Sequence, residues 1–410
     1  MMKIELLKHI PKAINKLHKN IIPIYARGSF VLDNNNKRYL DLTSGIGALS
    51  TGHCHPYLTE KVREQADNYV HIQQQIFGTH PVQYELNQKL LKTMPTNKLN
   101  NIFYVNSGSE AIDNAIKISR CHTKKSNIIS MRRGFHGRSL GALSITSSNL
   151  SVKKKSHPLV PGTFFCSDFN KKSLNDILEH QSAPEDTAAI ILEPVLGESG
   201  VHSVPKHFLK YCRYLCDKHN MLLVADEVQC GAGRTGTWWN ISQKDVIPDM
   251  ITFAKGIASG YQLAGVCAND SILNELPVGF LGGTYGGNAI SCAAASATID
   301  IINDENILEN VNVLGEYISS NVSNFRFVKE VRQYGLMIAI EFDFSYDLPH
   351  RVLNVVEKLR DRGVLVLMSG NKNQYIRLLP PLNIKKEEVD IFLEELYNIL
   401  NSTEEDIFLL

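Results

Sequence analysis

Short apolar runs alternate along this chain with longer stretches in which apolar residues recur at helical spacing. The apolar runs include residues 101–105, 127–130, 188–192 and 221–224. Runs of this kind are typical of buried strands in a parallel sheet, and the intervening spacing is typical of amphipathic helices. The order strand, loop, helix repeats from about residue 43 to residue 304. It predicts an α/β fold, with a mostly parallel sheet covered by helices on both faces.

The segments before and after this region follow other patterns. Residues 29–33 and 38–42 flank three consecutive asparagines, a pattern that predicts a β-hairpin. After Asn306 the pattern predicts a long helix, two or three strands around 328–342, and two further helices. We therefore expect three parts: an amino-terminal segment, 1–43, that packs with the small domain; a large domain, 44–305; and a small α+β domain, 306–410.

Composition excludes several classes of protein. Of the 410 residues, 43% are hydrophobic and 21% are charged, which is ordinary for a globular protein, and the net charge is only +1. We therefore expect no nucleic-acid partner and no membrane partner. The first 22 residues contain no Arg and lack an apolar core, so we expect neither a signal peptide nor a transit peptide. The eight cysteines form no CxxC pair, which favours reduced thiols and a cytoplasmic location.

An acid and an amine each follow an apolar run in the large domain. Asp226 ends the run that begins at Leu222, and Lys255 follows the run 250–254. The carboxyl ends of strands are where open α/β sheets bind ligands. A Lys that forms a Schiff base and an Asp that pairs with a pyridinium nitrogen are the pair that pyridoxal phosphate chemistry uses. A solvated Lys and an Asp that caps a turn are the alternative, which these two residues alone leave open.

A second candidate site follows the run 101–105. Small residues at a strand-to-helix turn leave backbone N–H groups free to bind an anion, and the helix dipole adds attraction. Gly108 and Ser109 are therefore candidate phosphate ligands, although an ordinary helix N-cap would give the same pattern. The loop FHGR at 135–138 offers an aromatic ring, Phe135, that could cover a cofactor, and Arg138, which could bind a carboxylate. A basic surface loop is the alternative there.

Two motifs are typical of a nucleotide site and a metal site, and we interpret neither motif as such a site. GAGRTG at 231–236 matches the dinucleotide fingerprint GxGxxG, but five residues separate it from the apolar run, and Thr237-Trp238-Trp239 stands where a helix should begin. We interpret it as a loop beside the site. The triplet His53-Cys54-His55 lacks a fourth ligand nearby in the sequence, so we expect no metal site.

Taken in order, these segments closely resemble the class III aminotransferases, pyridoxal phosphate enzymes of fold type I. The resemblance extends from about residue 23 to residue 400. Its motifs are LSTGHCHP at 49–56, SGSEA at 107–111, FHGR at 135–138, EPVLGE at 193–198, DEVQ at 226–229, GAGRTG at 231–236, FAKG at 253–256 and GGTYGGN at 282–288.

The resemblance implies a role for each residue around the cofactor, pyridoxal 5'-phosphate. Lys255 would be the Schiff-base lysine, which also moves a proton during the reaction, and Asp226 would pair with the pyridinium nitrogen. Thr284 would reach the phosphate in the other subunit, so the family pattern implies a homodimer with shared active sites. The remaining implied contacts are Gln229 near the ring hydroxyl, Phe135 and Val228 on the two ring faces, and Gly108 and Ser109 on the phosphate.

The resemblance also implies how the substrate is held. Arg138 would bind the carboxylate remote from the reacting amine, and Ile46 would line the channel. Arg377 would bind an α-carboxylate, and Glu198 would pair with Arg377 when no α-carboxylate is present. The motifs QLAGV at 262–266 and LGGTY at 281–285 are most similar to the 4-aminobutyrate aminotransferase branch.

The expected reaction is therefore transfer of an amino group from an ω-amino acid to 2-oxoglutarate, which gives a semialdehyde and glutamate. Acetylornithine and ornithine aminotransferases, a racemase or epimerase on the same scaffold, and a non-catalytic relative are the alternatives. The chain departs from the expected branch at Phe135, where Tyr is common, at Ser199, where Gly is usual, and at Gln73-Gln74-Gln75, which replaces a more apolar stretch. These differences do not change the residues expected to carry out transamination, but they leave the identity of the amino donor open.

Overall fold

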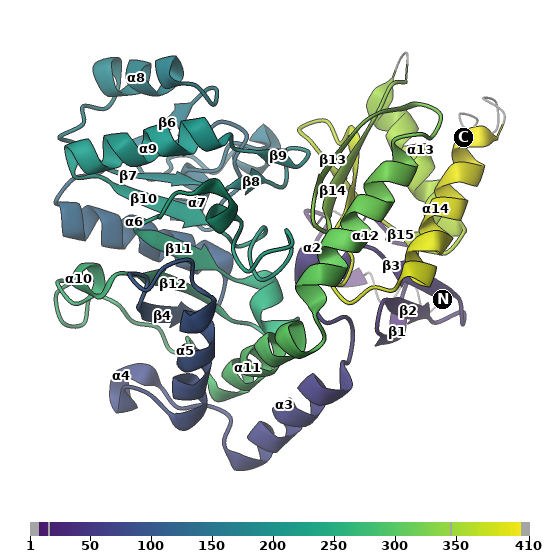
Figure 1. Ribbon diagram of the computed structural model, residues 1–410, viewed down its shortest axis with the longest axis horizontal. Coiled ribbons are helices and arrows are strands. Elements are labelled where there is room, and N and C mark those ends of the chain that lie inside the picture. The colour runs from purple at the N-terminus through teal and green to yellow at the C-terminus, as the bar shows by residue number, and fades with distance from the viewer. Residues whose placement is uncertain (1–7, 15–16, 345–346, 403–410) are drawn as a thin grey trace.

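A seven-stranded mixed sheet forms the centre of the larger part of the molecule (Figure 1). The computed structural model describes residues 8–14, 17–344 and 347–402. In spatial order the strands are β4 (Asn101–Val105), β12 (Ala264–Ala268), β11 (Met250–Phe253), β10 (Leu222–Asp226), β7 (Thr187–Leu192), β5 (Asn127–Met131) and β6 (Thr163–Cys166). Only β12 runs antiparallel to its neighbours, β11 and β4. The predicted α/β class with a mostly parallel sheet is confirmed.

Helices cover both faces of this sheet because its central strands are apolar on both sides. All six residues of β7 are buried: Ile190 and Leu192 belong to the hydrophobic cluster on one face, and Ala189 and Ile191 belong to the cluster on the other. The first cluster includes residues of α5 (Pro81–Thr93), α8 (Lys171–His180), α9 (Lys206–His219) and α11 (Ala289–Asp304). The second includes residues of α6 (Gly108–Thr123), α7 (Leu140–Ser144) and α10 (Asp270–Leu273).

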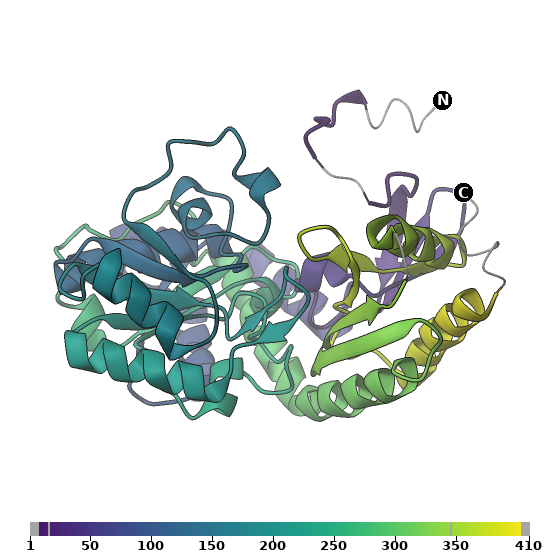
Figure 2. The same cartoon turned by 90° about the horizontal axis from the view of Figure 1, so that it is seen from above.

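The carboxy-terminal part of the chain forms a second lobe, which Figure 2 shows beside the first. Its four-stranded sheet has the order β13 (Val328–Tyr334), β14 (Met337–Phe342), β17 (Tyr375–Leu378) and β16 (Leu367–Ser369). Three helices contribute to its hydrophobic core: α12 (Ile307–Val322), α13 (Leu348–Asp361) and α14 (Lys386–Asn401). The three helices and strands β13 and β14 match the elements that the sequence predicts after residue 306, whereas β16 and β17 were not predicted.

The amino-terminal strands lie on this second lobe. β2 (Phe30–Asp33) and β3 (Arg38–Asp41) pair antiparallel, which confirms the predicted hairpin. β1 (Pro23–Arg27) extends the sheet on one side, and β15 (Val364–Leu365) pairs with β3 in parallel on the other. Two segments more than 300 residues apart thus share one sheet, while the exact domain bounds remain a prediction.

The remaining elements are short or connect the two lobes. They are α2 (Ser44–Gly47), α3 (Pro56–Asn68), α4 (Gln74–Phe77), the hairpin β8 (Val195–Leu196) and β9 (His202–Ser203), and the 3₁₀ turns η1 (Leu150–Val152), η2 (Asn240–Lys244) and η3 (Lys255–Ala258). The 231–236 loop is a series of turns followed by η2 and not by an α-helix, in agreement with its interpretation as a loop. None of the helices in the described ranges is long and apolar enough to cross a membrane.

Candidate active site

A cavity of about 320 Å³ opens at the carboxyl ends of β10 and β11 and at the start of α6. Most of the residues predicted to bind the cofactor meet there, although they come from four separate segments of the chain. Those that line the cavity are Gly108, Ser109, Phe135, Asp226, Val228, Gln229 and Lys255. The strand ends therefore bring the predicted amine, acid and anion-binding turn to a single place.

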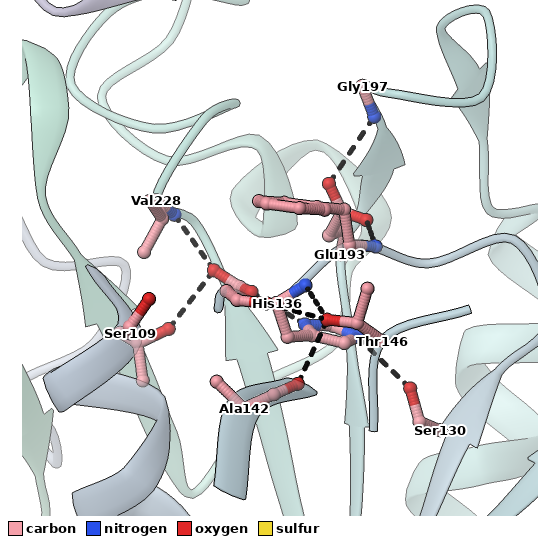
Figure 3. A network of polar contacts seen from close by, with 12 residues as sticks. Ser109, Ser130, His136, Ala142, Thr146, Glu193, Gly197 and Val228 are labelled. Carbon is pink, nitrogen blue, oxygen red and sulfur yellow. Dashed lines mark hydrogen bonds and ion pairs between the residues drawn. The ribbon is translucent and has the colours of Figure 1, made fainter. Parts of the chain in front are cut away.

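Asp226 lies at the floor of the cavity in a closed polar network. The residue is 2% exposed, and its Oδ2 lies 2.6 Å from Nδ1 of His136. Its Oδ1 accepts from the hydroxyl of Thr252 at 3.2 Å and from the backbone N–H of Val228 at 3.1 Å. The far side of the His136 ring, Nε2, lies 3.0 Å from the hydroxyl of Ser130 (Figure 3). The carboxylate is thus held in one orientation.

His136 carries charge more readily than a buried imidazole normally does. Burial alone lowers its pKa, but the hydrogen bond and the negative charge of Asp226 outweigh burial, and the pKa of His136 is raised. His136 belongs to the FHGR motif, in which the sequence pointed to roles for Phe135 and Arg138 only. The sequence offered one signal of a role for His136, its place in a loop that follows a strand, three residues beyond Arg133. No local pattern indicated that this side chain would reach Asp226.

Lys255 stands directly after the second strand of the pair. β10 and β11 are parallel neighbours, and Asp226 pairs in register with Thr252, three residues before Lys255. Burial lowers the pKa of Lys255, against the opposing charge of Glu198. A lowered pKa leaves a larger fraction of the amine neutral, and the neutral amine is the form that acts as a nucleophile and as a base.

The start of α6 forms another part of the cavity wall. The hydroxyl of Ser107 caps the helix by accepting from the N–H of Glu110 at 3.2 Å, and Gly108 and Ser109 line the cavity. Backbone N–H groups in the first turn of a helix have no partner within the helix and attract an anion. A Cβ atom on Gly108 would stand 2.8 Å from a methyl group of Val228, so a larger residue at this position would collide with the cavity wall.

Glu193 is a second residue to which sequence reasoning assigned no role. It follows β7, lines the cavity, and accepts from the N–H of Phe135 at 2.8 Å and of Gly197 at 3.3 Å (Figure 3). Burial raises the pKa of Glu193 to about 7. The side chain therefore joins the loop of Phe135 to the loop that continues toward Glu198. Its position at a strand end was visible in the sequence, but its partners were not.

An ion pair joins the two lobes next to the cavity. Arg377 of β17 donates to Glu198 at 2.7 Å and to Oε1 of Gln229 at 3.3 Å. Burial raises the pKa of Glu198, but the positive charges of Arg377 and Lys255 outweigh it, and the pKa of Glu198 is lowered. In the described part of the chain, Nε of Arg377 is buried without a hydrogen-bond partner. Glu198 and Gln229 thus leave the Nε donor of the guanidinium unused.

Besides Glu198 and Arg377, which lie next to the cavity, three further predicted site residues do not line it. Arg138 is exposed, and its backbone N–H donates to the hydroxyl of Ser109 at 3.1 Å. Thr284 is exposed in the loop that precedes α11, and the side chain of Ile46 is 47% exposed in α2. Their roles toward substrate and partner subunit remain predictions.

The turn that contains Ile46 has an unusual backbone. Ser44, Gly45, Ile46 and Gly47 have φ values of 39°, 64°, 64° and 75°, so four consecutive residues are left-handed. A left-handed conformation costs a residue other than glycine about 1–2 kcal/mol, and a β-branched residue such as isoleucine rarely adopts it. The rest of the structure must therefore hold this turn in place.

The motif histidines that could have suggested a metal have other partners. Nε2 of His53 lies 3.2 Å from Asp41, and Nε2 of His55 lies 3.0 Å from Glu305.

Comparison with known proteins agrees with this geometry. Residues 13–400 match the family described as Aminotransferase class-III. The chain is 36% identical to 5-aminovalerate aminotransferase DavT of Pseudomonas putida, with 93% of each chain covered. It is 35% identical to 4-aminobutyrate aminotransferase GabT of Escherichia coli, with 94% of each covered. Acetylornithine aminotransferase of Archaeoglobus fulgidus is also 35% identical, over 94% of this chain and 99% of that protein.

A solved structure shows the same fold. A transaminase from the marine bacterium Virgibacillus superposes with a TM-score of 0.90 at 28% identity, over 97% of this chain and 98% of the other. The chain belongs to the class III aminotransferases, which are pyridoxal phosphate-dependent transaminases.

The residues in the cavity fit that cofactor. The helix start at Gly108 and Ser109 can hold a phosphate, Asp226 can face a ring nitrogen, and the amine of Lys255 can reach an aldehyde carbon. Phe135 and Val228 line the cavity as apolar surfaces suited to a flat ring.

Proposed function

We propose that this transaminase moves an amino group from an ω-amino acid of the 4-aminobutyrate type to 2-oxoglutarate. The observation that carries the proposal is the pair of Glu198 and Arg377 beside Lys255. Glutamate places a carboxylate on the carbon that bears its amine, and an ω-amino acid does not. A site that serves both needs a cation that can be neutralised when no α-carboxylate arrives, because an unpaired buried Arg is costly.

We expect Glu198 and Arg377 to be arranged differently for the two substrates. With an ω-amino acid bound, Glu198 stays on Arg377 and keeps its charge satisfied. With glutamate bound, the α-carboxylate takes the place of Glu198 on the guanidinium, whose Nε already lacks a partner in the described residues. Arg138 would then bind the distal carboxylate from the exposed side of the site.

Asp226 and Lys255 would carry the chemical steps. Bound pyridoxal phosphate supplies an electron sink for the carbon that loses its proton. Asp226, fixed by His136 and Thr252, keeps a proton on the ring nitrogen by its negative charge. Lys255, whose pKa is lowered by burial, takes a proton from the substrate carbon and delivers one on the same side.

A second candidate reaction uses acetylornithine or ornithine as the amino donor. It is favoured by the acetylornithine aminotransferase of Archaeoglobus fulgidus, which is as similar to this chain as GabT of Escherichia coli. Its second half-reaction, with glutamate and 2-oxoglutarate, would use Arg377 in the same way. The two candidates therefore differ only in the donor.

A donor screen with 2-oxoglutarate as acceptor tests the proposal. We expect 4-aminobutyrate or 5-aminovalerate to give the highest kcat/KM, with glutamate formed in equal amount. A higher kcat/KM with acetylornithine or ornithine would replace the proposed donor by the second candidate. Conversion of one amino acid enantiomer into the other, without glutamate formation, would instead indicate a racemase. Lys255→Ala is the control for non-enzymatic transfer.

We also propose that the enzyme is a homodimer whose active sites include Thr284 of the partner chain. A group of large apolar side chains around the loop of Thr284 supports this, with exposures of 61% for Val70, 74% for Ile76, 66% for Phe77 and 63% for Tyr285. The ring of Tyr285 contacts the ring of His71, so this group forms one surface. Exposed apolar patches of this kind are typical of protein interfaces.

Mixing two inactive variants tests the shared site. In a mixed dimer of Lys255→Ala and Thr284→Ala, one of the two sites contains both an intact Lys255 and an intact Thr284. Subunit exchange should therefore restore activity if Thr284 serves the partner, and should restore none if it serves its own chain. Sedimentation of the wild-type protein gives the oligomeric state directly.

The cytoplasmic location also remains a proposal, supported by eight cysteines that are all unpaired.

A further inference from the structure

We infer that Asp41, together with His53, is a positioning residue that holds the left-handed turn Ser44–Gly47 as a wall of the substrate channel. The inference rests on the proposed function, because it concerns the part of the site that would receive the carbon chain of the amino donor. It assigns to Asp41 the control of substrate affinity rather than of cofactor binding or of the chemical step.

Asp41 holds the entrance of the turn with one carboxylate oxygen and contacts His53 with the other. The residue is 4% exposed. Its Oδ1 accepts from the N–H of Thr43 at 2.8 Å, from the hydroxyl of Thr43 at 2.6 Å and from the N–H of Ser44 at 3.2 Å. These bonds fix the two residues at which the chain enters the left-handed conformation. Oδ2 remains free of them and faces Nε2 of His53 at 3.2 Å.

His53 is itself anchored beyond the other end of the turn. Its N–H donates to the carbonyl of Gly28, and the N–H of Gly28 donates to the carbonyl of His53, both at 2.8 Å. A Cβ atom on Gly52 would stand 2.8 Å from the carbonyl oxygen of Gly28, so the two backbones are in close contact. The contact between Asp41 and His53, which are 12 positions apart in the chain, thus closes a loop around the turn.

The turn lies between the substrate side and the lysine side of the active site. The hydroxyl of Ser44 donates to the carbonyl of Leu379 at 2.5 Å, two residues after Arg377. A Cβ atom on Gly256 would stand 3.5 Å from the carbonyl oxygen of Gly47, directly after Lys255. Ala48, the next residue after the turn, lines the cavity. A shift of the turn would therefore move the wall between Arg377 and Lys255.

Because the backbone of the turn is strained, the turn needs the hydrogen bonds of Asp41 to keep its conformation. Ile46 is a β-branched residue at φ 64°, which its neighbours must impose because the residue does not favour it. Without the bonds of Asp41, the turn would relax toward an ordinary conformation and Ile46 would point elsewhere. The donor would then lose contacts with the wall, while the groups around Asp226 and Gly108 would stay in place.

Asp33 provides a matched control. It ends β2 as Asp41 ends β3, is 2% exposed, and accepts from the N–H groups of Asn35 and Lys37 at 2.8 and 2.9 Å. Asp33→Ala removes a buried turn carboxylate of the same kind, whose partners Asn35 and Lys37 do not line the cavity. Loss of stability alone should affect the two variants alike.

The test compares the holoenzymes of Asp41→Ala, Asp33→Ala and wild type with the best amino donor of the wild-type enzyme. We expect Asp41→Ala to raise the KM for the donor by about fivefold or more, with kcat within about twofold and the absorbance of the bound cofactor unchanged. Asp33→Ala should leave that KM unchanged at a comparable loss of Tm. Asp41→Asn, which keeps one acceptor oxygen, should give an intermediate KM.

Three results would overturn the inference: an unchanged KM in Asp41→Ala, an equal rise in Asp33→Ala, or failure of both Asp41 variants to fold, which would make Asp41 a residue of the fold as a whole. The proposed function fails separately, if the wild-type enzyme transaminates no ω-amino acid. The comparison of KM values would still be made with whichever donor the enzyme uses.

Discussion

The two ends of the active site are built in different ways. At the cofactor end, Asp226 and Lys255 follow adjacent strands of one sheet, and their relative position is set by the backbone pairing of β10 with β11. At the substrate end, Glu198 and Arg377 come from separate lobes and are 179 positions apart in the chain. The cofactor end depends on regular secondary structure, whereas the substrate end depends on how two lobes pack.

This difference has a functional consequence. The cofactor end is nearly closed, with Asp226 at 2% exposure and in contact with His136, and changes there should abolish the reaction for every substrate. The side chain of Glu198 is 28% exposed, so the substrate end can exchange partners. Changes there should alter which substrate reacts.

The largest effect is expected for Lys255→Ala at the cofactor end. The change removes the amine that serves as nucleophile and proton carrier, and it leaves the surrounding fold intact. Turnover with every donor should be abolished, while circular dichroism and sedimentation match the wild-type protein. Transamination at the wild-type rate would show that Lys255 is only a structural lysine.

Asp226→Asn should retain the cofactor and lose about 10²-fold or more in kcat, because the amide cannot keep the ring nitrogen protonated. Steady-state rates and the absorbance of the bound cofactor measure the two properties separately. A rate within about threefold of wild type would mean that Asp226 merely caps its strand.

Glu198→Gln tests the substrate end. Without its carboxylate partner, Arg377 keeps an unsatisfied charge that favours ligands with an α-carboxylate. The half-reaction with 4-aminobutyrate should therefore slow about tenfold more than the half-reaction with glutamate. Single-turnover mixing with each amine, followed by the cofactor spectrum, gives both rates. Equal losses would make Glu198 structural and would remove the main support for an ω-amino donor.

The smallest effect concerns Glu227, which is buried next to Asp226 but does not line the cavity. It accepts from the N–H of Ile241 at 2.7 Å, and burial raises its pKa to about 7 from an ordinary 4.5. Because the folded-state pKa is the higher one, the stabilisation is complete below pH 4.5 and is lost as the pH rises through 7. Glu227→Gln should remove this dependence.

We therefore expect the unfolding free energy of Glu227→Gln to rise relative to wild type by on the order of 1–3 kcal/mol between pH 5 and pH 8. Urea unfolding at a series of pH values measures it. Glu193 titrates in the same window but is present in both proteins, so its contribution cancels in the difference. Glu394→Gln, at an exposed position, is the control and should show no such change. The prediction would be contradicted if the unfolding free energies of Glu227→Gln and of wild type changed with pH in parallel.

The hydrophobic pattern of the chain was enough to predict a mostly parallel sheet, helices on its two faces and the strand-end positions of Asp226 and Lys255, although not the order of the strands or the antiparallel β12. These features are local: an apolar run marks a buried strand, and a residue at the end of a parallel strand lies at the edge where ligands bind. The family motifs added the identity of the cofactor. The loop character of residues 231–236 was also visible, because the residues that follow could not begin a helix.

Only the tertiary structure decided which side chains meet across segments. His136 reaches Asp226 over 90 residues, Arg377 donates to Gln229, and Asp41 faces His53 across a turn whose left-handed backbone no local pattern predicts. Each of these contacts depends on how separate elements pack, and packing is set by shape and burial over the whole core rather than by the spacing of neighbouring residues. For that reason the sequence indicated which residues carry the chemistry, whereas the fold decided which side chains hold those residues in position.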